Sequence, residues 1–199
     1  MLAMLKSTMV NSDRRERERA ARRQLIIGTA RKLAETEGWD AVTTRRLSTE
    51  IEYSQPVLYK HFAGMERIAE AVALDGFAEL AAVCAAAGSG GGSGSEALTR
   101  IARAYLDFAR DNPAVYDAMF TRATTLRFAA DDTPPQLEAA FAGLRQAVSA
   151  AANHSDADTA AEVFWAALHG LVTLNRTGRL RAGFDSERLA LLVEQFTGG

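Results

Sequence analysis

The spacing of apolar residues is the feature that most constrains the fold of this 199-residue chain. Along almost every segment they recur at intervals of three and four, as Leu137, Phe141, Leu144 and Val148 do, and no segment shows a clear period of two. A period near 3.6 places such residues on one face of an α-helix, whereas a half-buried strand needs a period of two. The sequence therefore predicts an all-α fold of about nine helices without a sheet.

Composition places the chain among folded, soluble proteins. It is 48% hydrophobic and 24% charged, as is typical of globular chains, and no run reaches the roughly 18 to 20 uninterrupted apolar residues of a membrane span. The first residues lack the features of a signal peptide, so we expect a cytoplasmic protein that binds no membrane. A lone Cys84 and three scattered histidines offer neither a disulfide nor a zinc site. We expect no metal and no cofactor.

Charge is divided unevenly along the chain. Residues 1–65 carry 12 Lys and Arg against 8 Asp and Glu, a net charge of +4, whereas residues 66–199 carry −6. The net charge of −2 for the whole chain conceals this difference. Such asymmetry indicates that the basic segment meets a polyanion and that the acidic segment does not.

A glycine and serine run at residues 88–95 interrupts the helical pattern and predicts a flexible linker. Ser95 is the predicted N-cap of the helix that follows. The run comes after a predicted helix rather than a strand and contains no Lys, so it is not a phosphate-binding loop. The sequence also lacks a nucleophile elbow and a metal-ligand cluster, and we therefore expect no enzymatic activity.

Three helices are predicted in the basic segment. The first covers about 14–36, the second follows an N-cap at Thr43, and the third runs from Gln55 to Phe62 with Pro56 in its first turn. Only residues 52–54 join the second helix to the third. These are the dimensions of a helix-turn-helix, whose last helix enters the major groove of DNA.

The Arg-rich residues 1–18 are predicted to be a flexible arm. The run from Arg14 to Arg19 has two interpretations. It is a solvated helical face with pairs such as Glu18 to Arg22, or a disordered arm that reaches into the minor groove.

Two segments carry a resemblance to a known family. The sequences GWDAVTTRRL at 38–47 and SQPVLYKHF at 54–62 resemble the N-terminal signature of TetR-family transcriptional regulators, and LYKHF is the most specific part. The resemblance covers residues 20–75. It implies a DNA-binding domain at 19–65 and a helical ligand-binding and dimerisation domain at 66–199. It also implies a homodimeric repressor that binds a palindromic operator in double-stranded DNA and is released by a small-molecule effector.

The resemblance also implies roles for individual residues. The start of the second helix would meet the DNA backbone or a base edge, the first turn of the third helix the bases, and its last turn the phosphates. Gln can bond adenine through two hydrogen bonds, and Val can contact a thymine methyl group. Leu58 and Phe62 are expected in the core. The predicted DNA contacts are Thr43, Thr44, Arg45, Ser54, Gln55, Pro56, Val57, Tyr59, Lys60 and His61.

Two positions depart from the family pattern. Glu52 stands in the turn where Gly is common, and it needs a left-handed or otherwise adapted backbone. Met65 stands where a Lys is common, which removes one expected phosphate contact. Both departures weaken the expectation of tight operator binding.

The last two predicted helices, at about 155–175 and 185–197, are apolar on more than one face. Two such helices from each subunit would form a four-helix dimer interface. The pattern Trp165-x-x-x-His169-Gly170 resembles the WHG-type C-terminal domain of one TetR branch. The predicted interface residues are Phe164, Leu168, Leu171, Leu189, Leu192, Val193 and Phe196.

An effector pocket among the C-terminal helices would be mostly apolar with a few polar groups. Each candidate can equally be plain core, and His169 is expected to be a hydrogen-bonded structural histidine. The candidates are Tyr105, Phe108, Tyr116, Met119, Phe120, Phe141, Trp165 and His169. The alternative function is that of a ligand-independent or architectural DNA-binding protein, which needs the same DNA-binding domain and no pocket.

Overall fold

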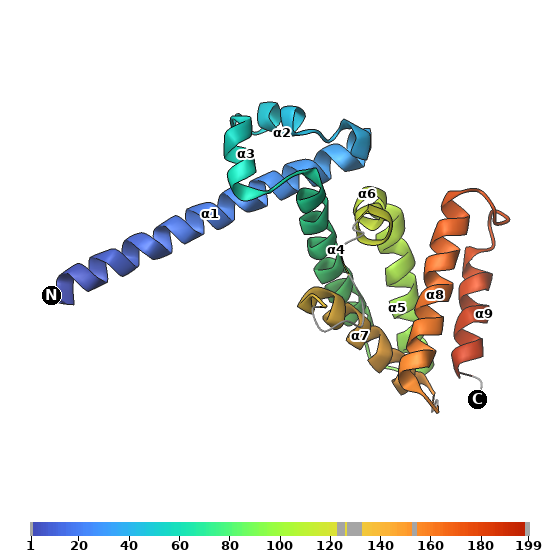
Figure 1. The fold of residues 1–199 in the computed structure, drawn as a ribbon. Helices are drawn as coiled ribbons and strands as arrows, with labels where there is room; N and C mark the ends of the chain where they lie inside the picture. The colour runs from blue at the N-terminus through green and yellow to red at the C-terminus, as the bar shows by residue number, and fades with distance from the viewer. Residues whose placement is uncertain (1, 123–125, 127–132, 153–154, 198–199) are drawn as a thin grey trace.

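The computed structural model describes residues 2–122, 126, 133–152 and 155–197, and these residues form nine α-helices and no strand (Figure 1). The predicted all-α fold is confirmed. Short 3-10 and π-helical turns lie at Trp39–Ala41 and Ala118–Arg122. The helices are α1 (Leu2–Glu37), α2 (Thr44–Glu50), α3 (Gln55–His61), α4 (Met65–Gly88), α5 (Gly94–Asp111), α6 (Pro113–Asp117), α7 (Pro135–Ala151), α8 (Ala157–Arg176) and α9 (Asp185–Thr197).

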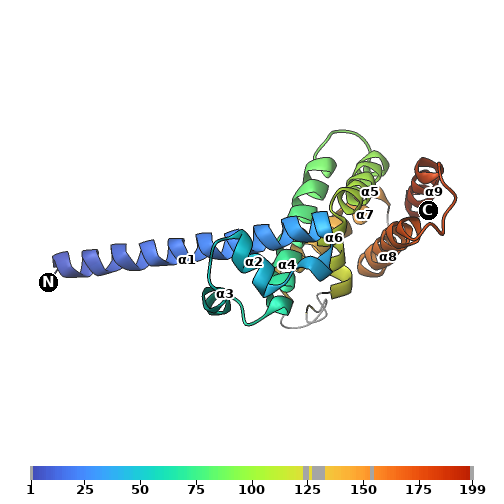
Figure 2. The ribbon, with the colours of Figure 1, turned by 90° about the horizontal axis from the view of Figure 1, so that it is seen from above.

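The helices α1, α2 and α3 form a small head, and α4 to α9 form a larger body. The two share one continuous core. Helices α2 and α3 lie beside α1, whose N-terminal half projects away from every other element in both views (Figures 1 and 2). Helix α4 leads from the head into the body, where it contacts α5, α6 and α7 as well as α1. Helices α8 and α9 lie at the far side of the body from α1 (Figure 1).

Helix α4 is the one described helix that is long and apolar enough to cross a membrane by length and composition alone. Its side chains Ile68, Val72, Phe77 and Leu80 are instead buried against neighbouring helices. A helix that is covered on several sides is apolar for that reason. Packing in the core therefore accounts for the composition of α4.

Gly76 allows α6 and the π-helical turn to approach α4 closely. A methyl group at this position would lie 2.5 Å from Val115 Cγ1 and 2.9 Å from Met119 Sδ, which is closer than such atoms can pack. Both neighbours are buried and have little room to move. We expect Gly76→Ala to lower the free energy of unfolding by about 1–3 kcal/mol, since overpacking a dense core has that cost.

Gly143 provides the matched control for this substitution. It lies within α7 and is exposed, and apart from its own helix backbone no atom of the described residues lies within 4 Å of the position of an added methyl group. Gly143→Ala should raise the free energy of unfolding by roughly 0.5–1 kcal/mol, because Ala is the better helix former. Urea unfolding followed by circular dichroism distinguishes the two variants. A Gly76→Ala protein as stable as Gly143→Ala would contradict the close approach.

The N-terminal boundary predicted for the first helix was wrong. Helix α1 begins at Leu2, so residues 2–18 are helical where the sequence predicts a flexible arm. Residues 14–23 are all Arg, Glu or Ala, which are good helix formers, and Arg14 pairs with Glu18 one turn on at 2.9 Å. The C-terminal boundary was predicted well, because α1 ends before Gly38, whose φ is 84°.

The glycine-rich linker is shorter than predicted. Gly88 still belongs to α4 and Gly94 already belongs to α5, so residues 89–93 form the connection. Ser93, not Ser95, is the N-cap of α5, and Glu96 completes a capping box with it. Arg100 donates hydrogen bonds to the carbonyl oxygens of Ala87 and Gly90 and so holds the connection in place. Most of the Thr-rich sequence that precedes Thr133 lies outside the described residues.

Candidate nucleic-acid interface

The turn between α2 and α3 is tight because Glu52 adopts a left-handed backbone. Its φ is 56°, the one positive value among the described non-glycine residues, and it costs about 1–2 kcal/mol. The N–H of Tyr53 donates to the carbonyl of Ser48 over 3.0 Å. The expected adaptation at Glu52 is confirmed. This turn brings α3 against α2, with Leu47 and Leu58 buried in the core they share.

Helix α2 is capped at its own N-terminus and joined to α1 by one ion pair. The side chain of Thr43, the predicted N-cap, accepts the backbone N–H of Arg46 at 3.1 Å. The guanidinium of Arg46 pairs with Glu37 of α1 and with Glu50, each at 3.0 Å. Exposed pairs of this kind contribute little stability each, and of the two only the pair with Glu37 joins α2 to α1.

Helix α3 presents most of its predicted DNA-contacting side chains to solvent. Tyr59 is 54% exposed, and Gln55, Pro56 and Lys60 are exposed beside it, whereas Leu58 is buried. No side-chain hydrogen bond or ion pair occupies Gln55, Tyr59 or Lys60 in the described part of the chain. Their polar groups are therefore available to phosphates and base edges.

The remaining predicted DNA-contacting residues differ in how exposed they are. Thr43, Arg45 and Ser54 are exposed or nearly so, while Thr44, Val57 and His61 are half-buried. Ser54 occupies the N-cap position of α3 as expected, but its side chain makes no capping hydrogen bond. Its hydroxyl can therefore contact DNA instead.

Three arginines of α1, Arg19, Arg22 and Arg23, lie near the end of α3. Arg19 belongs to the run for which the sequence offers a minor-groove arm as one interpretation, whereas Arg22 and Arg23 were missed as DNA contacts. Arg23 donates to the carbonyl oxygen of His61 at 3.1 Å, and its guanidinium lies 4.0 Å from the ring centre of Phe62. Burial, followed by the charges of Arg19, Arg22 and Arg23, lowers the pKa of His61. The C-terminal end of α3 thus lies in a positive field that attracts phosphate. In the sequence, Arg22 and Arg23 follow Arg19 at the spacings of three and four that place residues on one side of a helix, and this spacing could have identified them.

Comparison with known proteins identifies this arrangement. Residues 26–72 match the family model described as bacterial regulatory proteins, tetR family, and residues 98–196 match the tetracyclin repressor-like C-terminal domain. An uncharacterized HTH-type transcriptional regulator of Mycobacterium tuberculosis is 32% identical over 161 residues, which cover 78% of this chain and 71% of that protein. The chain belongs to the TetR family of transcriptional regulators. This membership makes it a DNA-binding regulator and indicates a regulatory rather than an enzymatic role.

Solved structures share the TetR fold over most of this chain. A Rhodococcus sp. RHA1 protein of unknown function has a TM-score of 0.72 at 24% identity and covers 89% of this chain and 94% of its own. The TetR family regulator PfmR from Thermus thermophilus has a TM-score of 0.61 at 20% identity, with 87% and 97% covered. At such identities the likeness concerns the fold alone.

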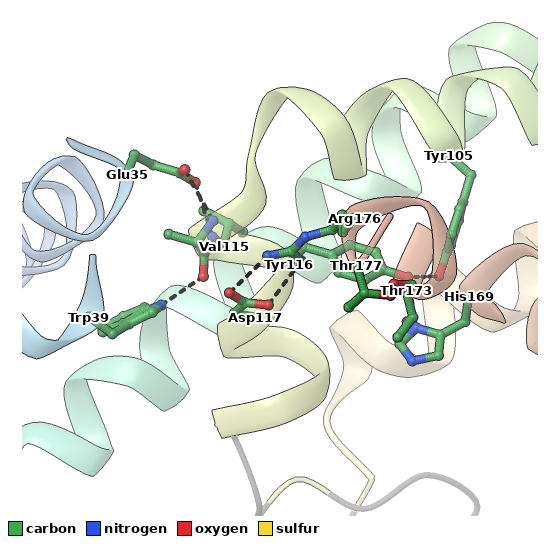
Figure 3. A network of polar contacts seen from close by, with 11 residues as sticks. Glu35, Trp39, Tyr105, Val115, Tyr116, Asp117, His169, Thr173, Arg176 and Thr177 are labelled. Atoms are coloured by element: carbon green, nitrogen blue, oxygen red, sulfur yellow. Dashed lines mark hydrogen bonds and ion pairs between the residues drawn. The ribbon is translucent and has the colours of Figure 1, made fainter. Parts of the chain in front are cut away.

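A buried polar network joins aromatic side chains in the body of this TetR-family protein (Figure 3). The hydroxyl of Tyr116 lies 2.8 Å from that of Tyr105 and 2.7 Å from Nδ1 of His169, and Trp165 Nε1 donates to Tyr105. Burial raises the pKa of both tyrosines, so both stay protonated at neutral pH. The expectation that His169 is a hydrogen-bonded histidine is confirmed.

The predicted effector pocket is nearly closed. The cavity at this place has a volume of about 30 Å³, whereas drug-sized ligands occupy roughly 300–1,000 Å³. Cys84 also lines it, and burial raises the pKa of its thiol to about 11, so the thiol stays protonated. Of the predicted pocket residues, Tyr105, Phe120, Phe141 and Trp165 line this cavity, while Phe108, Tyr116, Met119 and His169 do not.

A larger cavity was missed from the sequence. It has a volume of about 380 Å³ and lies between α5, α8 and α9, where Leu106, Leu171, Arg103 and Arg188 contribute to its wall. Apolar spacing identifies the buried face of each helix but does not report the gaps left between three helices. The sequence pattern therefore could not predict this cavity.

The environment of His169 predicts loss of stability in mild acid. Burial lowers its pKa from 6.5, so the folded protein binds fewer protons at this residue than the unfolded chain does. The free energy of unfolding then falls as the pH drops below about 6.5. We expect the Tm to decrease between about pH 7 and 5, and His169→Gln to flatten this decrease. Thermal unfolding across that range tests the assignment, and an unchanged slope in His169→Gln would refute it.

Helix α6 connects this polar network to the DNA-binding head (Figure 3). The carboxylate of Glu35 in α1 accepts the backbone N–H groups of Ala114 and Val115 at 3.1 and 3.0 Å. Trp39 Nε1 donates to the carbonyl oxygen of Ala114 at 2.8 Å. Tyr116 is the next residue of α6. The head and the aromatic network are thus attached to consecutive residues of one short helix.

Most of the residues predicted at a dimer interface belong to the core of the single chain. Phe164, Leu168, Leu189 and Val193 are buried there and cannot present a surface to a partner, so their assignment to an interface is corrected. The other three, Leu171, Leu192 and Phe196, are half-buried.

Other residues form the outer surface of α8 and α9. Val163 and Leu174 of α8 and Leu191 of α9 are 54%, 39% and 59% exposed. Between Val163 and Leu174, the small residues Ala167 and Gly170 continue the same face with spacings of four, three and four. The sequence showed that these helices are apolar on two faces but not which of the two meets the core.

Proposed function

We propose that this TetR-family protein is a homodimeric repressor that binds an inverted-repeat operator and is released by a small hydrophobic ligand. The observation that carries this proposal is the polar face of α3, which is exposed to solvent and makes no side-chain hydrogen bond or ion pair within the described residues. The head that bears this face is hydrogen-bonded to the body through α6. Paired heads related by a two-fold axis require an operator with the same symmetry. We expect the protein to act in the cytoplasm, where its DNA is.

The outer surface of α8 and α9 supports the dimer. Three large apolar side chains, Val163, Leu174 and Leu191, are exposed on these two helices, as at surfaces that another protein covers. The small residues Ala167 and Gly170 between them allow a second helix to approach closely. Two copies of this pair of helices form a self-complementary four-helix interface.

The contacts of α6 support release by a ligand. Tyr105 and Trp165 line the small cavity and belong to the network that holds Tyr116, so a ligand that widens the cavity by moving either side chain perturbs this network. Movement of Tyr116 alters the N-terminus of α6, which Glu35 of the head binds. A ligand changes DNA affinity only by its differential affinity for the two states of this connection.

The small volume of the cavity favours a second candidate, a ligand-independent DNA-binding protein. Thermal unfolding of the purified protein with a panel of hydrophobic small molecules separates the two. A ligand at a hundred times its Kd stabilises the folded state by about 2.7 kcal/mol, so the repressor hypothesis predicts a raised Tm with at least one compound and release of bound DNA by the same compound. DNA binding that no compound of the panel weakens, together with an unchanged Tm, would favour the second candidate.

A further inference from the structure

We propose that α1 extends the DNA interface beyond α3 through three arginines that bind phosphates of the duplex flanking each half-site. Arg15, Arg19 and Arg22, called here the arginine stripe, are spaced by four and three residues and share one face of the helix. All three are exposed. The inference rests on the proposed binding of an operator by the face of α3.

The orientation of the stripe follows from the residues that continue it. The next positions on the same face are Ile26 and Leu33, which are buried in the core beneath the head. Arg23, adjacent to the stripe, hydrogen-bonds to the last residue of α3. The charges of Arg19 and Arg22 are also near enough to lower the pKa of His61. The stripe is therefore continuous with the positive end of α3.

No described part of the protein occupies the stripe. None of its three guanidinium groups makes an ion pair or a hydrogen bond within the described residues, and the neighbouring Glu18 is bonded to Arg14 at 2.9 Å. Figures 1 and 2 show the N-terminal half of α1 projecting away from every other element. An external polyanion is the complementary partner for three such charges.

The dimensions favour duplex DNA as that polyanion. From Arg15 to Arg22 the helix rises by roughly 10 Å, at about 1.5 Å per residue. Duplex DNA carries one negative charge per about 1.7 Å of its axis, so several phosphates fall within this distance. Because the stripe adjoins α3, duplex that enters the α3 site and continues past it passes this stretch of α1.

The test first selects, from random double-stranded DNA, the sequence that the protein binds. It then compares two duplexes that both contain this sequence. One ends at the half-sites, and the other continues for about one helical turn on each side. The triple variant Arg15→Gln, Arg19→Gln and Arg22→Gln keeps helix propensity. Its matched control removes three exposed charges from the body, far from the stripe in the chain, at Arg103, Arg179 and Arg181.

We expect the wild type and the control to bind the longer duplex about tenfold more tightly and with a steeper salt dependence, by up to about 0.9 in log–log slope per arginine. The stripe variant should bind both duplexes with the affinity that the wild type has for the short one. Equal binding of the two duplexes by the wild type, or a full gain in the stripe variant, overturns the inference while leaving operator binding intact. Binding of the stripe to phosphatidylserine vesicles without a gain on the longer duplex also overturns it. Failure of the wild type to bind either duplex would instead refute the proposed function on which it rests.

Discussion

Replacing Tyr59 and Lys60 together by alanine is expected to weaken operator binding by about a hundredfold or more and to leave the fold unchanged. Both side chains are exposed on α3 and make no hydrogen bond or ion pair within the described chain, so the head does not depend on them. In a dimer the change removes four phosphate contacts. Two of these contacts come from the charged Lys60, and only a phosphate neutralised by a charged side chain contributes about 0.9 to the slope of log affinity against log salt, so the slope should flatten by about 1.8.

Titration of the operator at several salt concentrations measures both effects. Lys32→Ala is the matched control, because it removes an exposed positive charge from α1 away from the face of α3. It should retain nearly the affinity and salt dependence of the wild type. If the double variant binds as the control does, α3 is not the element that contacts DNA.

Leu191→Glu is expected to convert the dimer into monomers. The side chain is 59% exposed in the single chain, so a carboxylate there is solvated in the monomer but buried and unpaired in the proposed interface. Breaking an interface in this way costs several kcal/mol, since an isolated buried charge is strongly unfavourable. Leu192→Glu is a poorer choice, because Leu192 is packed against the core and its replacement also threatens the fold.

Sedimentation velocity measures this second result. The variant should sediment as a monomer with an unchanged circular dichroism spectrum, and its operator affinity should fall because two linked heads bind more tightly than one. Gln146→Glu makes the same charge change on an exposed position of α7 and should remain dimeric. A dimer that persists in Leu191→Glu would place the interface elsewhere.

The sequence predicted the helices of this fold because apolar periodicity records which residues face a core. Helix α9 was predicted at 185–197, which are its bounds, and Leu58 and Phe62 are buried as expected. Helix ends were predicted less well where local hydrogen bonds decide them. The capping box of Ser93 and Glu96 moved the start of α5, although its spacing was present in the sequence.

Tertiary contacts account for what the sequence did not reveal. The exposed face of α3 was predictable, because the motif and the exposed positions coincide in one short helix. The hydrogen bonds of Glu35 with the start of α6 join residues about 80 positions apart, and no local pattern reports such a pair. The same holds for the buried side of α8, since Phe164 and Val163 are adjacent apolar residues with opposite surroundings.

Selection of random double-stranded DNA by the purified protein, followed by sequencing, tests the central claim most directly. A two-fold symmetric TetR-family dimer predicts enrichment of an inverted repeat whose half-sites are separated by about one helical turn, roughly 34 Å, or a multiple of it. Affinity for that sequence should fall steeply with salt. Enrichment of no sequence, or of an asymmetric one bound without salt dependence, would contradict the account.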